Sequence, residues 1–90
     1  MAFGKKRRRH AIGLRIEELS IKAQPFAHIV DTEPPNSLPW KDAAVELCRL
    51  TKESLDLARA LGEPNILDAA ESAAARVRSQ CPVEAEKVGL

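Results

Sequence analysis

The fold is decided by residues 38–81, which read LPWKDAAVELCRLTKESLDLARALGEPNILDAAESAAARVRSQC. Helix signals flank the first part of this stretch. Ser37 suits an N-cap, Pro39 suits the first turn, and Gly62 suits the left-handed position that ends a helix. These signals predict one helix over residues 38–61. Apolar residues cover more than half of its circumference, which is too much for a single neighbouring helix to bury.

A second helix is predicted over residues 66–80. Asn65 suits its N-cap, its acidic residues come early and its basic residues late, and Pro82 should end it. Its apolar side is a heptad seam of mostly small side chains, formed by Leu67, Ala70, Ala74, Val77 and Cys81. Because only three residues connect the two helices, an antiparallel helical hairpin is expected over residues 38–81. Residues 82–90 are expected to form a frayed tail.

Residues 12–30 are predicted as a β-like segment, with a helix as the alternative. Of the six apolar residues in its first half, a helix would place four on one face and two, Leu14 and Ile21, on the opposite face. A β-hairpin turning at Glu17 and Glu18 would place all six on one face. A single strand with a bulge would keep the same facing. The β form is therefore favoured over the helix.

The chain as a whole is expected to be mainly α-helical, with an antiparallel helical hairpin, a short N-terminal β-strand or β-hairpin and a disordered basic arm over residues 1–11. A Pro-rich linker is predicted at residues 31–39, because three prolines favour an extended path. The 90 residues, 44% of them hydrophobic, suffice for one small globular domain. No apolar run approaches the roughly 18 residues that a membrane span requires.

Charge is distributed unevenly along the chain. Residues 1–15 carry six basic residues and no acid, whereas residues 16–90 carry 8 basic and 13 acidic residues, a net charge of −5. Five of the basic residues are consecutive: Lys5, Lys6, Arg7, Arg8 and Arg9. Such a cluster is typical of a solvated tail, and it also suits contacts with nucleic-acid phosphate or another polyanion, a localisation signal or an anionic lipid contact. The shortage of aromatic residues argues against a base-stacking surface.

No residues have the spacing of a catalytic, metal or cofactor site. His10, His28, Cys48 and Cys81 lie too far apart in sequence for zinc-ligand pairs, and the glycines form no phosphate loop. An enzyme is therefore not expected. The two cysteines should lie at nearly the same level of the hairpin, either bridged or free. With two cysteines and no recognisable export signal, a cytoplasmic location is expected.

These observations predict a small non-enzymatic interaction protein, whether adaptor, regulator or inhibitor, that homodimerises through its hairpin and binds a macromolecular partner, expected to be a protein. The predicted interface is the apolar surface of the two helices, at Trp40, Ala44, Leu47, Leu50, Leu57, Leu61, Ala70, Ala73, Ala74 and Val77. The alternative is a nucleic-acid-binding accessory protein in which Lys5 to Arg9 contact backbone phosphate.

Overall fold

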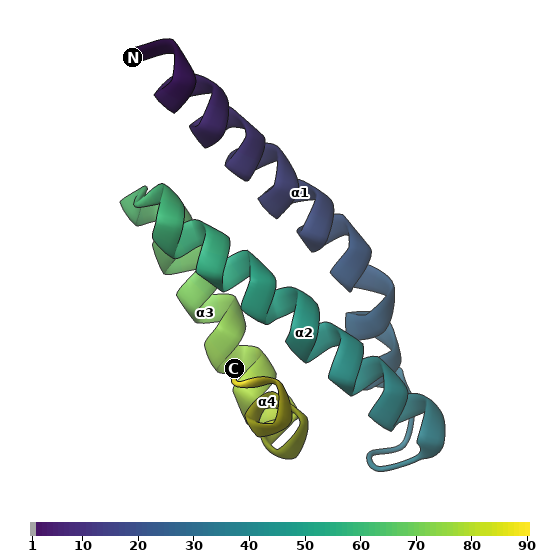
Figure 1. Ribbon diagram of the computed structural model, residues 1–90. Coiled ribbons are helices and arrows are strands. Elements are labelled where there is room, and N and C mark those ends of the chain that lie inside the picture. The colour runs from purple at the N-terminus through teal and green to yellow at the C-terminus, as the bar shows by residue number, and fades with distance from the viewer. Residues whose placement is uncertain (1) are drawn as a thin grey trace.

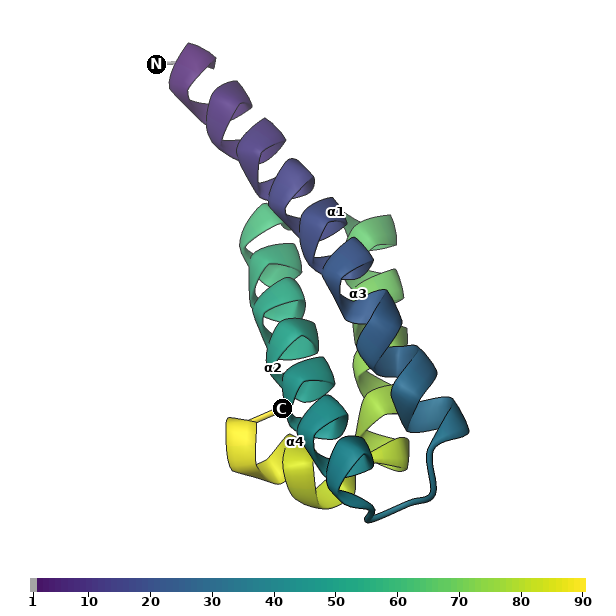
Figure 2. The ribbon, with the colours of Figure 1, turned by 90° about the vertical axis from the view of Figure 1, so that its right-hand side faces the viewer.

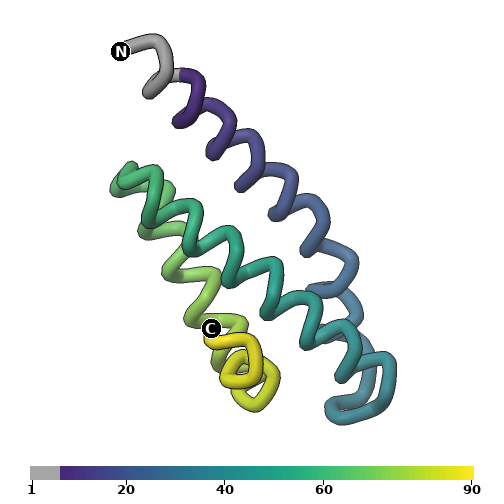
Figure 3. Tube along the Cα trace, in the orientation of Figure 1, coloured from purple at the N-terminus to yellow at the C-terminus, as the bar shows by residue number. Residues whose placement is uncertain are grey.

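The computed structural model describes the backbone of residues 2–90 and the side chains of residues 7–90. The described chain is helical and contains no strand. Its helices are α1 (Ala2–Thr32), α2 (Leu38–Leu61), α3 (Pro64–Gln80) and α4 (Pro82–Val88). The first three run antiparallel in chain order, as the tube in Figure 3 shows. Helix α2 lies between α1 and α3, and the short α4 crosses one end of α2 (Figures 1 and 2).

Helix α2 begins and ends where the sequence predicts. The Ser37 Oγ accepts a hydrogen bond from the Trp40 backbone N–H at 3.4 Å, and Pro39 lies in the first turn. At the other end Gly62 has a φ of 74°, and its N–H donates to the Ala58 carbonyl at 3.0 Å. Both ends are set by neighbouring residues alone, which is why the sequence locates them.

The β-like segment predicted over residues 12–30 is wrong, because these residues form most of α1. The buried and half-buried residues of α1 include a heptad stripe, made of Ile12, Ile16, Leu19, Ala23, Phe26 and Val30. Leu14 and Ile21, whose position on the opposite side argued against a helix, remain 52% and 64% exposed. The β prediction assumed that all the apolar residues must be buried together, and α1 leaves these two outside.

Two further features of α1 differ from the expectation. Residues 2–11, expected as a disordered arm, form its first turns. Pro25 lies inside the helix although proline has no N–H, so the carbonyl of Ile21 has no backbone donor. Both Pro25 and Ile21 lie on the exposed side of α1, where water is available to that carbonyl. The solvent-facing position makes the proline tolerable within a helix.

The connection between α1 and α2 is shorter than the linker predicted over residues 31–39. It spans residues 33–37, because the ends of the predicted linker belong to the two helices. The Val30 carbonyl would ordinarily accept a hydrogen bond from residue 34, but Pro34 has no N–H. The indole Nε1 of Trp40 donates to this carbonyl instead, at 3.1 Å. A side chain of α2 thus provides the hydrogen bond that the backbone cannot provide at the C-terminal end of α1.

The C-terminal part corrects two further expectations. Helix α3 starts at Pro64 with Glu63 in the capping position, so Asn65 is not its N-cap. The expected tail over residues 82–90 instead contains α4, which begins at Pro82. The last carbonyl of the chain accepts a hydrogen bond from Arg78 Nε at 2.7 Å. The end of the chain is therefore fastened to α3.

The main core lies toward the end of the molecule that holds α4 and the α1–α2 connection. It comprises Val30, Trp40, Ala43, Ala44, Leu47, Cys48, Val77, Cys81 and Ala85. At the opposite end α1 projects beyond the turn between α2 and α3 (Figure 2). None of the described helices has the length and hydropathy of a membrane span.

Candidate functional site

A groove runs between α1 and α3, with α2 as its floor. Helices α1 and α3 both pack against α2 but make few contacts with each other. The main hollow between them has a volume of about 350 Å³. It is lined by Leu19, Ser20, Ala23, Gln24, Ala27 and Asp31 of α1, by Leu47, Leu50, Thr51 and Ser54 of α2, and by Ala70, Ala73, Arg76, Val77 and Gln80 of α3. We call this feature the α1–α3 groove.

The lining of the groove is apolar below and polar at the rim. Its floor consists of side chains that are almost fully buried: Leu47 and Leu50 of α2, with Leu19 of α1 and Val77 of α3 beside them. Its walls are half-buried alanines, Ala23 and Ala27 on α1 and Ala70 and Ala73 on α3. Because the alanine side chains of the walls are small, the groove has room above its buried apolar floor for large apolar side chains of another helix.

A second hollow, of about 400 Å³, continues the groove toward the turn between α2 and α3. Its lining includes Gly13, Leu14 and Glu17 of α1 and Ile66 of α3. On α1 the lining residues of the two hollows share one side at heptad spacing, through Gly13, Glu17, Ser20, Gln24, Ala27 and Asp31. The groove therefore follows α3 along nearly its whole length, about 25 Å at 1.5 Å per residue.

Among the side chains that the structure describes, polar contacts reach from α1 to α3 or to its N-cap residue only at the two ends of this groove. At one end the Arg9 guanidinium lies 3.3 Å from a carboxylate oxygen of Glu63. At the other end Gln80 Nε2 donates to Asp31 Oδ1 at 3.0 Å. No other side-chain hydrogen bond or ion pair connects the two helices among the side chains that the structure describes. Helices α1 and α3 are thus connected near the two ends of the groove and are separated along its middle.

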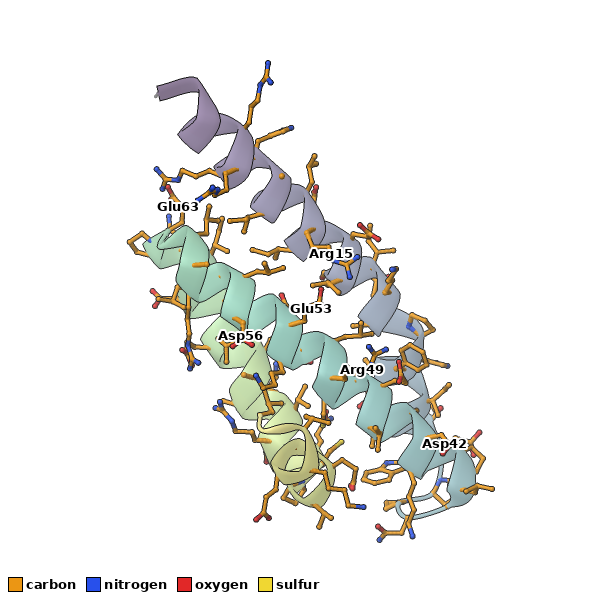
Figure 4. The ribbon with its side chains drawn as sticks, in the orientation of Figure 1. Arg15, Asp42, Arg49, Glu53, Asp56 and Glu63 are labelled. Atoms are coloured by element: carbon orange, nitrogen blue, oxygen red, sulfur yellow. The ribbon has the colours of Figure 1, made fainter. Side chains whose placement is uncertain are left out.

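On the side away from the groove, ion pairs hold α1 against α2. Arg15 lies 2.9 Å from Glu53 of α2 and 2.9 Å from Glu18 of its own helix, and Lys22 lies 3.1 Å from Glu18. Figure 4 shows Arg15 and Glu53 pointing toward each other. The hydrogen bond to Glu53 raises the pKa of Arg15. The pKa of Glu18 is lowered mainly by the hydrogen bond from Lys22 and to a smaller extent by Arg15. Because these side chains are exposed, they orient α1 more than they stabilise the fold.

The residues predicted for a dimer interface lie mostly inside the chain. Seven of them are buried: Trp40, Ala44, Leu47, Leu50, Leu61, Ala74 and Val77. The other three, Leu57, Ala70 and Ala73, are half-buried. Helix α1 covers the apolar surface of α2 that the sequence analysis assigned to a second copy. Homodimerisation through the seven buried residues therefore has no support in the structure.

Sequence reasoning missed the α1 wall of the groove. Ser20, Gln24 and Ala27 were placed in a β-like segment, so their common side was not recognised. The signal that would have found them is the heptad stripe from Ile12 to Val30, which identifies α1 and thereby its neighbouring side.

The basic cluster lies on the end of α1 that projects from the body. Arg7, Arg8 and Arg9 are exposed, and the side chains of Lys5 and Lys6 lie outside the described residues. Arg9 pairs with Glu63, whereas Arg7 and Arg8 make no ion pair with any described side chain. Positive charges at a helix N-terminus oppose the helix dipole, so an anion at this end would be stabilising.

The two cysteines are core residues rather than reactive groups. Cys48 and Cys81 belong to one core cluster, at the same level as expected, and are free thiols without exposed surface. The pKa of Cys48 is raised to about 12, mainly by burial and to a smaller extent by the neighbouring Cys81. Burial also raises the pKa of Cys81. Protonated thiols are poor nucleophiles and poor metal ligands. The described residues include no cluster of three or more His, Cys, Asp or Glu suited to a metal ion.

Comparisons with protein-family models, with curated proteins and with solved structures find no match to this chain. Its function must therefore be inferred from the α1–α3 groove and from the basic end of α1.

Proposed function

We propose that this chain is a small non-enzymatic interaction protein, and that its α1–α3 groove binds a helix of a macromolecular partner. The arrangement of the three long helices is the observation that carries this proposal. In a closed three-helix bundle each helix packs against both others. Here α1 and α3 both pack on α2 but stand apart, as diagonal helices do in a four-helix bundle. The corner opposite α2 is vacant.

The lining of the groove indicates the chemistry of the partner helix. A helix is about 10 Å wide, and the groove follows α3 for about 25 Å, which corresponds to four to five helical turns. The apolar floor and alanine walls suit large aliphatic or aromatic side chains at i, i+3, i+4 and i+7. The polar rim, which holds Ser20, Gln24 and Gln80 beside the charged Asp31 and Arg76, suits the polar flanks of such a helix. An amphipathic helix therefore fits this surface.

Site-specific photo-crosslinking in the source cells tests the proposal. A photoreactive amino acid at Gln24, on the groove rim, should form a covalent adduct with a protein. The same amino acid at Lys87, which is exposed on α4 away from the groove, provides the control. An adduct from Gln24 and none from Lys87 supports binding in the groove. No adduct from Gln24, or equal adducts from both positions, contradicts it.

A second candidate function, nucleic-acid binding, is favoured by one specific observation. Arg7 and Arg8 are exposed on the projecting end of α1 without an ion pair to any described side chain. In the sequence they follow two further basic residues, Lys5 and Lys6, whereas the chain from residue 16 onward is acidic. Such contacts give sequence-independent affinity that falls steeply with salt.

Duplex DNA binding measured against salt concentration tests this candidate. With four or five phosphate contacts, affinity should fall roughly 100-fold to 1,000-fold between about 50 and 200 mM salt. Replacement of Lys5, Lys6, Arg7 and Arg8 by glutamine should abolish binding, and Arg9 is kept because it pairs with Glu63. Replacement of the exposed Lys41 and Lys87 should have little effect. If the full chain shows no affinity at the lower salt concentration, this candidate is excluded and the groove proposal is untouched.

A further inference from the structure

Two large apolar side chains of α1 are more than half exposed in the described part of the chain. Leu14 and Ile21 are 52% and 64% exposed and lie one heptad apart, on the side of α1 opposite to the stripe that packs on α2. A third exposed apolar residue, Ile66 of α3, lines the groove at the same level as Leu14. The chain thus has a vacant groove and an apolar strip along its α1 edge, of which Leu14 also lines the second hollow.

We propose that the groove is occupied by α1 of a second copy of this chain, in a two-fold symmetric dimer in which the two α1 helices run parallel. This inference rests on the proposed function, because it names the occupant of the same groove. It differs from a dimer formed through the buried residues of α2 and α3, because of the interface residues expected from the sequence it uses only the half-buried Ala70 and Ala73.

One symmetry operation matches the two unpartnered surfaces. A rotation of 180° about an axis parallel to α1, on the groove side of that helix, moves α1 of the second copy into the vacant corner. The same rotation places α2 of the second copy on the side of its own α1 that is opposite to α3 of the first copy. The side of its α1 that faces away from its own α2, which holds Leu14 and Ile21, therefore turns toward α3 of the first copy. By symmetry the contact is made twice, once in each groove.

The positions of the contacting residues along the axes of α1 and α3 agree with this arrangement. A rotation about an axis parallel to α1 leaves each residue at its own height. Leu14 of the second copy therefore meets Ile66, because both residues line the same hollow. Ile21 follows Ser20, which lines the main hollow with Ala70 and Ala73, so Ile21 of the second copy meets this alanine wall. The small side chains leave the space that an isoleucine needs.

The contact between the two α1 helices uses the groove side of each. Gly13, Ser20 and Ala27 on this side are small, so the two helix backbones can approach closely at these three positions. Glu17, Gln24 and Asp31 lie on the same side, so each faces its own copy across the axis, and the two acidic pairs oppose the contact. A helix from an unrelated protein would fill the groove, including the hollow that Leu14 lines, but would leave Ile21, which lines neither hollow, in water. A second copy covers the groove and the strip together, which is the reason for choosing it as the occupant.

Sedimentation equilibrium of the purified full chain tests the dimer. The wild-type chain should be a dimer at concentrations of tens of micromolar, and Ile21→Glu should raise the dissociation constant at least about tenfold. Val83→Glu is the matched control, because Val83 is 59% exposed on α4, outside the proposed contact. Thermal unfolding by circular dichroism checks that both variants fold. A monomeric wild-type chain, or equal weakening by the two substitutions, would overturn the inference.

Cysteine cross-linking tests the parallel register. Ser20 lies near the middle of the groove side of α1, so the two Ser20→Cys residues of a parallel dimer should face each other. Mild oxidation with diamide, which takes up the two thiol hydrogens, should join them in a disulfide and double the chain mass of 9.9 kDa. Ser72→Cys, exposed on α3 and outside the groove lining, should not cross-link. Equal cross-linking of both variants, or of neither, would contradict the register.

The photo-crosslink at Gln24 separates a failure of this inference from a failure of the proposed function. An adduct of twice the chain mass supports the second copy. An adduct with a different protein, together with a monomeric purified chain, overturns the second copy and leaves the groove proposal standing. A dimeric chain whose dissociation constant is unaffected by Ile21→Glu also overturns this inference, whatever the crosslink shows.

Discussion

Trp40 makes a hydrogen bond that the backbone cannot make, because Pro34 has no N–H to offer the Val30 carbonyl. Trp40→Phe keeps most of the apolar surface but removes the donor from a buried acceptor. We expect this substitution to lower the free energy of unfolding by about 1 to 3 kcal/mol. Urea unfolding followed by circular dichroism measures it. Leu38→Ala, at a position that is 73% exposed, should change stability by less than about 0.5 kcal/mol, and equal effects would contradict the role given to the indole.

Cys48 should make the fold sensitive to alkali. Its pKa is raised from the ordinary 9.0 to about 12, so above pH 9 the unfolded chain loses a thiol proton that the folded chain keeps. Stability from this group is therefore complete below pH 9 and is lost as the pH rises toward 12. Unfolding measured between these pH values should show a smaller decline for Cys48→Ala than for the wild type. A parallel decline in both would show that Cys48 does not titrate as described.

Among the elements, α1 is the one whose sequence conflicts most with its structure. Pro25 removes one hydrogen bond from the helix interior, a defect that costs about 3 kcal/mol in ordinary helices. Pro25→Ala restores the donor to the Ile21 carbonyl, and the greater freedom of the unfolded chain offsets up to about 1 kcal/mol of the gain. We expect Pro25→Ala to be more stable by about 1 to 2 kcal/mol in thermal unfolding.

Pro39→Ala is the control for that substitution, because Pro39 lies in the first turn of α2, where no N–H is required. It should leave stability nearly unchanged or slightly lower it. A destabilised Pro25→Ala variant would mean that residues 12–30 are not a continuous helix in solution.

The contrast between α2 and α1 shows which elements could be predicted. The bounds of α2 depend on Ser37 and Gly62, whose effects are local, and both were identified from the sequence. The identity of α1 depends on long-range packing, since only contact with α2 decides that Leu14 and Ile21 stay outside. Pro82 illustrates a third case: a proline that ends α3 also suits the first turn of α4, so the stop signal concealed a helix.

For the whole molecule, the width of the apolar surface on α2 was predicted correctly but not what covers it. A sequence pattern states that Leu47 and Leu50 require burial, and it does not state whether the covering helix comes from the same chain. Once α1 is recognised as that helix, the same leucines become the floor of a groove between α1 and α3. The alanines at positions 70 and 73, which the sequence pattern placed in a dimer interface, form part of its α3 wall.

The proposed dimer and the basic end of α1 predict a coupling at the scale of the assembly. A parallel pair of α1 helices brings two basic ends together, and their repulsion opposes dimerisation. Added salt should therefore strengthen the dimer, in contrast to an interface held by ion pairs. Duplex DNA that contacts both ends should strengthen it further, since a ligand that prefers the dimer stabilises it by linkage.

Sedimentation with and without duplex DNA checks this coupling. Replacement of Lys5, Lys6, Arg7 and Arg8 by glutamine should tighten the dimer without DNA, because the repulsion is removed, and should abolish the effect of DNA. Ile21→Glu should weaken both the dimer and the DNA affinity. The monomeric variant has one basic end, which contacts fewer phosphates than the two adjacent basic ends of a dimer. If the neutralised variant dimerises less tightly than the wild type, the two α1 helices do not lie parallel with their basic ends adjacent.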